Sequence, residues 1–126
     1  MPIQITAITD LKDVVIRNQV ERLYEISPEF GSGQDAITTL ENALEQDTIL
    51  YVAMFNDKII GAIWSEGTGT TRLLEYVIIH PANRNRGVAD RLISEVCRIE
   101  EEKGVTTFQP GCGAIHRCLV HLGKLQ

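Results

Sequence analysis

Arg84-Asn85-Arg86-Gly87-Val88-Ala89 sets the architecture that we expect of this chain. The stretch follows an apolar run that ends at Pro81, and it opens a helical pattern. Gly87 has no Cβ, so the backbone can approach a ligand closely at this point. A helix that starts here presents unpaired N–H groups and the positive end of its dipole, and Arg84 and Arg86 add permanent positive charge. Because such a helix start binds phosphate groups, the stretch predicts a strand, a diphosphate-binding loop and a helix.

Further strands and helices are predicted on both sides of this loop by the spacing of apolar residues. We expect strands over residues 3–8, 48–55, 58–65, 73–79 and 105–108. We expect helices over residues 11–26, 34–46, 87–102 and 114–122. Asp10 is the predicted N-cap of the first helix. The expected inward residues of that helix are Leu11, Val14, Val15, Leu23 and Ile26.

Composition and charge restrict the class of protein. The 126 residues, 44% of them apolar, suit a single domain over residues 1–126. A net charge of −5 argues against nucleic acid and anionic membranes as partners. No apolar run approaches the roughly 20 residues that span a bilayer, and the N-terminus lacks a signal-peptide pattern, so we expect a cytoplasmic protein. The three cysteines, an odd number without metal-ligand spacing, predict free thiols and no metal site.

The spacing R-x-x-G-x-A resembles the acetyl-CoA pyrophosphate loop of the GNAT acetyltransferases, Q/R-x-x-G-x-G/A. The predicted order β-α-α-β-β-β-α-β-α is also that of the GNAT fold. The resemblance, which extends to about Thr107, implies an α/β protein with a mixed central sheet, helices on both faces and acetyl-CoA (or CoA) as cofactor. Family members usually continue past the last helix into further strands, whereas Leu122-Gly123 is followed by three residues here. We therefore expect missing or abbreviated C-terminal strands and an open sheet edge that invites pairing, as in a homodimer.

The resemblance also implies where the cofactor lies. In the GNAT fold the strand before the loop splays from the next parallel strand, and pantetheine pairs with its backbone in the gap. The matching backbone positions are Val77, Ile78 and Ile79. The pyrophosphate would meet the loop residues Asn83, Arg84, Asn85, Arg86, Gly87, Val88, Ala89 and Asp90.

The residues for acetyl transfer are less complete than the cofactor loop. Transfer to an amine needs a base, a polarised thioester carbonyl and a proton donor for the thiolate. Glu75 is the expected base because it interrupts an apolar strand, although a charged residue near a sheet edge explains it equally well. The N–H of Val77 could polarise the carbonyl. Leu119 stands where the family usually has a donor tyrosine. We expect His116 and His121 to be surface histidines and not catalytic residues.

A narrower resemblance is to the PanZ/PanM-type maturation factors and regulators of aspartate 1-decarboxylase in pantothenate synthesis. It rests on residues 50–60, on Tyr24 with Ser27-Pro28-Glu29, and on residues 83–88. It implies that acetyl-CoA lets the protein dock on the decarboxylase, with Asn56 near the partner and Arg84 near the ligand. Met54 and His80 stand where that branch commonly has arginines.

Three functions therefore remain open from the sequence. The first is a CoA-responsive regulator that binds aspartate 1-decarboxylase. The second is an N-acetyltransferase for a small-molecule or peptide amine, with Glu75 or an ordered water as base. The third is a structural or interaction domain whose loop is coincidental.

Overall fold

The computed structural model describes residues 3–125, and its order of elements confirms the predicted β-α-α-β-β-β-α-β-α order. The elements are β1 (Gln4–Ile8), α1 (Val14–Tyr24), α2 (Gly33–Leu44), β2 (Thr48–Phe55), β3 (Lys58–Glu66), β4 (Thr71–Ile79), a 3₁₀ turn (Pro81–Asn83), α3 (Val88–Glu102), β5 (Thr107–Pro110) and α4 (Gly113–His121). The strands form one sheet in the order β1-β2-β3-β4-β5. Neighbouring strands are antiparallel except β4 and β5, which are parallel. Within residues 3–125, β5 is the last strand along the chain and forms one edge of the sheet.

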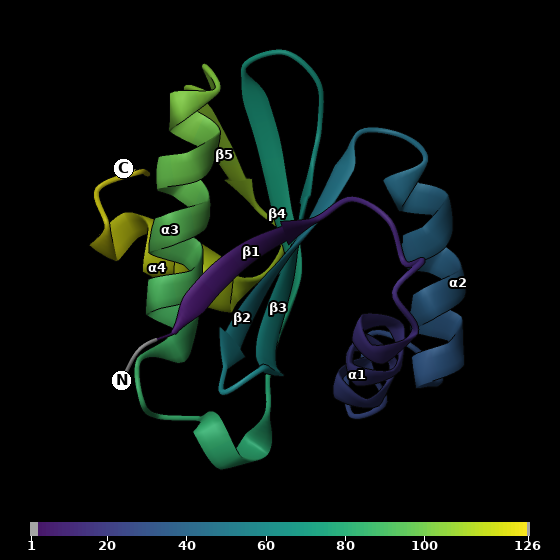
Figure 1. Cartoon of the computed structure of the whole chain (residues 1–126). Coiled ribbons are helices and arrows are strands. Elements are labelled where there is room, and N and C mark those ends of the chain that lie inside the picture. Colours follow the sequence, from purple (N-terminus) through teal and green to yellow (C-terminus); the bar gives the residue numbers. More distant parts are fainter. Residues whose placement is uncertain (1–2, 126) are drawn as a thin grey trace.

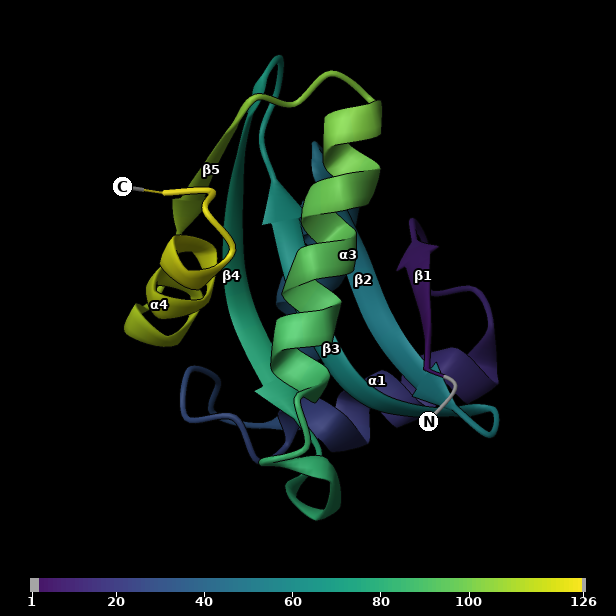
Figure 2. The same cartoon turned by 90° about the vertical axis from the view of Figure 1, so that its left-hand side faces the viewer.

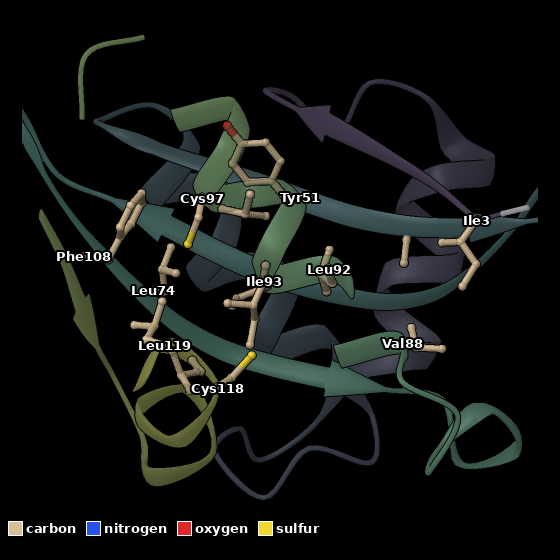
Figure 3. Packing of buried hydrophobic residues seen from close by; sticks show 14 of the residues in the cluster. Ile3, Tyr51, Leu74, Val88, Leu92, Ile93, Cys97, Phe108, Cys118 and Leu119 are labelled. Atoms are coloured by element: carbon tan, nitrogen blue, oxygen red, sulfur yellow. The ribbon is translucent and has the colours of Figure 1, made fainter. Parts of the chain in front are cut away.

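Helices cover both faces of the sheet, as the predicted fold class requires (Figure 1). On one face α1 and α2 bury side chains such as Val20, Ile37 and Leu40 against β2 and β3. On the other face α3 and α4 cover a second apolar cluster, to which α3 contributes Leu92 and Ile93 and α4 contributes Leu119 (Figures 2 and 3). The sheet therefore separates two hydrophobic cores and contributes side chains to both.

The prediction for the first helix is wrong at both ends. The helix begins at Val14, and its N-cap is Asp13, whose carboxylate accepts from two backbone N–H groups of the first turn. Asp10 lies outside the helix and accepts only from the N–H of Lys12. Val14 and Val15 are each 65% exposed, because both lie more than about 100° around the helix from the buried Val20.

Ile26 and Val105 were predicted to lie inside elements and lie outside them. Ile26 follows the end of α1 and is 47% exposed instead of facing inward. The last strand begins at Thr107, although Val105 is buried, because the N–H groups of Thr106 and Thr107 both bind the carbonyl of Thr70. Val105 thus packs into the core before the chain joins the sheet.

A buried polar network ties the C-terminal end of α3 to the sheet. Arg72 of β4 and Glu100 of α3 are 8% and 2% exposed, and their Nε and Oε2 atoms are 3.0 Å apart. The Arg72 Nε also lies 2.9 Å from the hydroxyl of Ser65. Glu100 accepts further bonds from Tyr51 and from Lys103. This network fixes α3 along its axis, and α3 begins at the predicted diphosphate loop.

Candidate functional site

The parallel strands β4 and β5 part halfway along β4. Their pairing runs from Thr71 with Thr107 to Leu74 with Pro110 and goes no further. Beyond it, the N–H of Gly111 donates to the carbonyl of Leu74 at 2.7 Å. A Cβ at Gly111 would lie 2.5 Å from the Cβ of Glu75, so only glycine allows the chain to leave β5 so close to β4. The expected gap between the two strands is therefore present.

A β-bulge lies at the point where the strands part. Between Ala62–Ile78 and Trp64–Glu75, the pairing advances two residues on β3 and three on β4. β4 therefore has one extra residue at this point. Tyr76 lies in the bulge and has a backbone φ of 56°, which residues other than glycine rarely adopt. The bulge turns the backbone of β4 just before the segment predicted to hold pantetheine.

A cavity of about 410 Å³ opens beyond the bulge. Its walls are Val77, Ile78 and Ile79 of β4, Asn83, Arg84, Asn85, Gly87, Val88, Ala89 and Asp90 of the loop and α3, and Ala114 of α4. The structure thus brings the predicted cofactor residues together, with one exception. Arg86 is exposed and is not among the lining residues. Ala114 was not predicted, because the sequence resemblance ends before α4.

The loop that follows β4 is held in place by its own hydrogen bonds. His80 donates its backbone N–H to the carbonyl of Ile60 at 2.8 Å, and its Nδ1 accepts from the N–H of Ala82. Arg84 donates from Nε to the carbonyl of Ile79 at 3.1 Å, so its side chain closes the loop onto β4. Gly87 is the N-cap of α3, in the left-handed conformation with a φ of 77° and without a side-chain cap. The first N–H groups of α3 are therefore left without a side-chain acceptor.

One acidic group lies beside the predicted diphosphate position. Asp90 is in the first turn of α3, where it favours the helix but opposes an anion. Its carboxylate accepts from the thiol of Cys118 at 3.3 Å, which links α3 to α4. Burial raises the pKa of Cys118, and likewise that of Cys97, to about 12, so both thiols stay protonated at neutral pH. The three cysteines are free, and no group of three metal-binding side chains occurs among residues 3–125.

Glu75 lies in the bulge, half-buried, on the side of the sheet that carries Trp64. Burial, followed by hydrogen bonding and repulsion from Glu66, raises the pKa of Glu75 to about 7. Glu29 of the α1–α2 connection adds a smaller repulsion. A carboxyl with such a pKa can accept a proton at neutral pH. Glu75 therefore has the proton affinity that a general base needs at neutral pH.

The side chains that were weighed as proton donors on α1 and α4 do not line the first cavity. Leu119 is fully buried in the core between α3 and α4. His116 and His121 are exposed on α4. Tyr24 is fully buried and donates its hydroxyl hydrogen to the carbonyl of Tyr76 at 2.6 Å. Tyr24 therefore contacts the bulge, a role that its position in the sequence did not indicate.

A second cavity, of about 690 Å³, lies beside the turn between β2 and β3. Asn56 and Asp57 form that turn, with φ angles of 51° and 63°. The side chain of Gln19 in α1 accepts from the N–H of Ile59 at 2.7 Å and so ties α1 to the hairpin. His80 also lines this cavity, next to Ile79 of the first one. The hairpin turn and the diphosphate loop lie at the same end of the sheet (Figure 1).

These features define the class of the protein. A mixed sheet with helices on both faces and a strand–loop–helix unit at parted parallel strands is the GNAT acetyltransferase architecture. The chain belongs to the family described as the acetyltransferase (GNAT) domain of PanZ, which matches residues 5–109.

Solved structures agree with this fold at low sequence identity. An aminoglycoside N-acetyltransferase, AAC(6')-Iy, in complex with CoA superposes with a TM-score of 0.75 at 17% identity, over 99% of this chain and 88% of that one. A putative GNAT acetyltransferase from Desulfovibrio desulfuricans gives 0.74 at 16% identity, over 97% and 84%. A GNAT-family acetyltransferase from Streptococcus pneumoniae TIGR4 gives 0.69 at 20% identity, over 97% and 84%. No curated protein matches the sequence. Among residues 3–125, no helix has the length and apolar character needed to cross a membrane.

Proposed function

We propose that this protein is a CoA-responsive regulator, which binds acetyl-CoA in the first cavity and then docks on aspartate 1-decarboxylase. The observation that carries the proposal is that consecutive residues line the two cavities, Ile79 the first and His80 the second. One partner surface placed over His80 would contact both the bound cofactor and the Asn56 turn. The partner could then sense whether the cofactor is present. Membership of the PanZ family supports the choice of partner.

The residues around the first cavity fit the cofactor chemically. The β4 backbone at Val77–Ile79 borders β3 on one side, but among residues 3–125 no strand pairs with it on the β5 side, so it can pair there with the amides of pantetheine. The N–H groups of Gly87, Val88 and Ala89 would hold the diphosphate, because they lie at an uncapped helix start. Arg84 supplies positive charge at the cavity wall, and the exposed Arg86 supplies it from outside. Acetyl-CoA itself would bring a thioester and an acetyl group.

Calorimetric titration with acetyl-CoA tests the cofactor site. We expect saturable binding by the wild-type protein and at least about a tenfold loss in Gly87→Trp, because the indole would fill the loop. Gly104→Trp is the matched control. Gly104 also has a positive φ and open space around its Cβ position, but it lies at the other end of α3. No binding by folded wild-type protein, or equal losses in the two variants, would reject the site.

Association with the decarboxylase tests the regulatory function. We expect the two proteins to associate when acetyl-CoA is present, and Asn56→Gly to weaken this association at unchanged acetyl-CoA affinity. Glycine is chosen because it removes the amide and keeps the positive φ of the turn. Thr68→Gly, in the exposed β3–β4 turn at the opposite end of the sheet, is the control. An acetyl-CoA-loaded protein that does not bind the decarboxylase from the same source would exclude this function.

The second candidate is N-acetylation of a small-molecule or peptide amine. The observation in its favour is Glu75, whose pKa of about 7 suits a base and whose place is beside the gap between β4 and β5. If Glu75 is the base, Glu75→Gln should lower turnover by about 10²-fold or more and leave acetyl-CoA affinity nearly unchanged. Equal turnover of the two proteins would remove Glu75 from this role.

A further inference from the structure

The hydroxyl of Tyr24 forms a hydrogen bond with a single peptide unit of the bulge. Tyr24 is the last residue of α1, is fully buried, and packs its ring edge-on against Phe30 and Trp64. Its hydroxyl donates to the carbonyl of Tyr76 at 2.6 Å. Burial raises the pKa of Tyr24 well above its ordinary value, so the hydroxyl keeps its proton. The donor is therefore permanent, and the packed ring holds it in one place.

The carbonyl of Tyr76 and the N–H of Val77 belong to the same peptide unit. A trans peptide is planar, and its C=O and N–H point in opposite directions. Because the carbonyl of Tyr76 points to Tyr24 on the α1 side, the N–H of Val77 points away from α1. Val77 is the first residue of β4 to line the first cavity, three residues after Leu74, where the pairing with β5 ends. Tyr24 thus sets the direction of a backbone donor at the cavity wall from the opposite face of the sheet.

We propose that Tyr24 is a positioning residue of the cofactor site, which aims the N–H of Val77 at the thioester carbonyl of bound acetyl-CoA. The inference rests on the proposed function and adds how the site distinguishes acetyl-CoA from CoA. CoA has a thiol in place of the thioester and offers no carbonyl oxygen to this donor. If the N–H of Val77 loses this orientation, the affinity for acetyl-CoA falls and the affinity for CoA stays unchanged.

The test is the ratio of acetyl-CoA affinity to CoA affinity in Tyr24→Phe, measured by calorimetry. The variant keeps the ring and removes only the hydroxyl. We expect acetyl-CoA affinity to fall about three- to tenfold, as for the loss of one hydrogen bond, and CoA affinity to stay within about twofold. Tyr51→Phe is the matched control, because Tyr51 is also fully buried and its hydroxyl bonds Glu100, away from the cavity. Tyr51→Phe should lower stability and keep the wild-type ratio.

The outcomes separate this inference from the proposed function. Absence of acetyl-CoA binding in the wild-type protein would reject both. Wild-type binding with an unchanged ratio in Tyr24→Phe, or an equal fall for both ligands, would reject the role of Tyr24 alone. If Tyr24→Phe does not fold by near-ultraviolet circular dichroism, the amide proton of Val77 is followed by NMR in the wild-type protein. A downfield shift of this proton with acetyl-CoA and none with CoA supports a hydrogen bond from Val77 to the thioester carbonyl. Identical shifts with both ligands overturn the proposal.

Discussion

At the scale of single residues, the site combines groups whose roles follow from their type with groups whose roles depend on their neighbours. Gly87 belongs to the first kind, because a left-handed helix start with free N–H groups needs glycine at this position. Glu75 belongs to the second kind. Its raised pKa comes from burial in the bulge and from Glu66 on the next strand, and neither is visible in the local sequence.

The pKa of Glu75 predicts a pH dependence of stability. The group binds a proton more tightly in the folded chain, where its pKa is about 7, than in the unfolded chain, where it is near 4.5. Between these values the folded state holds more protons, so stability falls as the pH rises, and the loss is complete above about pH 7. In the wild-type protein we expect this fall in the free energy of unfolding to be about 1 kcal/mol, because solvent screens the half-buried group. Glu75→Gln should abolish the fall.

Urea unfolding of both proteins at about pH 5 and about pH 8 measures this difference. The variant should gain on the wild type at the higher pH. Glu66→Gln is a useful companion, because removal of the neighbour should lower the pKa of Glu75 and flatten the profile. Parallel profiles of wild type and Glu75→Gln would show that Glu75 titrates normally.

At the scale of elements, the start of α1 shows why boundaries are harder to predict than elements. Two aspartates, at positions 10 and 13, lie near the start of the helical pattern, and aspartate is a favourable helix N-cap. Asp13 is the cap because its carboxylate reaches the N–H groups of Val15 and Ile16, at 2.9 and 3.2 Å. The helical spacing of Leu11 with Val14 and Val15 predicted an earlier start, although both valines face solvent.

Replacement of each aspartate by alanine should separate the two roles. We expect Asp13→Ala to lower the free energy of unfolding by about 1 kcal/mol, the usual value of a helix cap. Asp10→Ala should change it by less than about 0.5 kcal/mol, because that carboxylate bonds one loop N–H only. Chemical denaturation measures both, and a larger loss in Asp10→Ala would contradict the assigned cap.

At the scale of the whole molecule, the ion pair between Arg72 and Glu100 connects α3 to the sheet. Both groups are buried, so removal of one partner leaves the other charge without compensation. We expect Glu100→Ala to cost about 3–5 kcal/mol. Glu101→Ala is the control next to it in the chain. Glu101 pairs with Lys124 at 2.8 Å but is 40% exposed, and its loss should cost less than about 1 kcal/mol.

Guanidinium unfolding of these two variants compares the same substitution at neighbouring positions. A similar loss in both would mean that the network contributes no more than a surface pair. In that case the position of α3, and with it the diphosphate loop, would depend on apolar packing alone.

The element order, the two-sided layering and the position of the loop could be read from the amino-acid sequence, because periodicity, turn residues and the Arg84–Ala89 motif act over short distances along the chain. The residues that line the first cavity, apart from Ala114, could be named from the family resemblance, whereas Arg86, also named as cofactor-binding, lies exposed outside the cavity wall. The bulge at Tyr76, the hydrogen bond from Tyr24 to it and the pKa of Glu75 arise only when distant segments meet. The same holds for the two cavities, whose walls come from several elements and include the consecutive residues Ile79 and His80. They depend on strand register and on burial, which are long-range consequences of packing and leave no periodic trace in the chain.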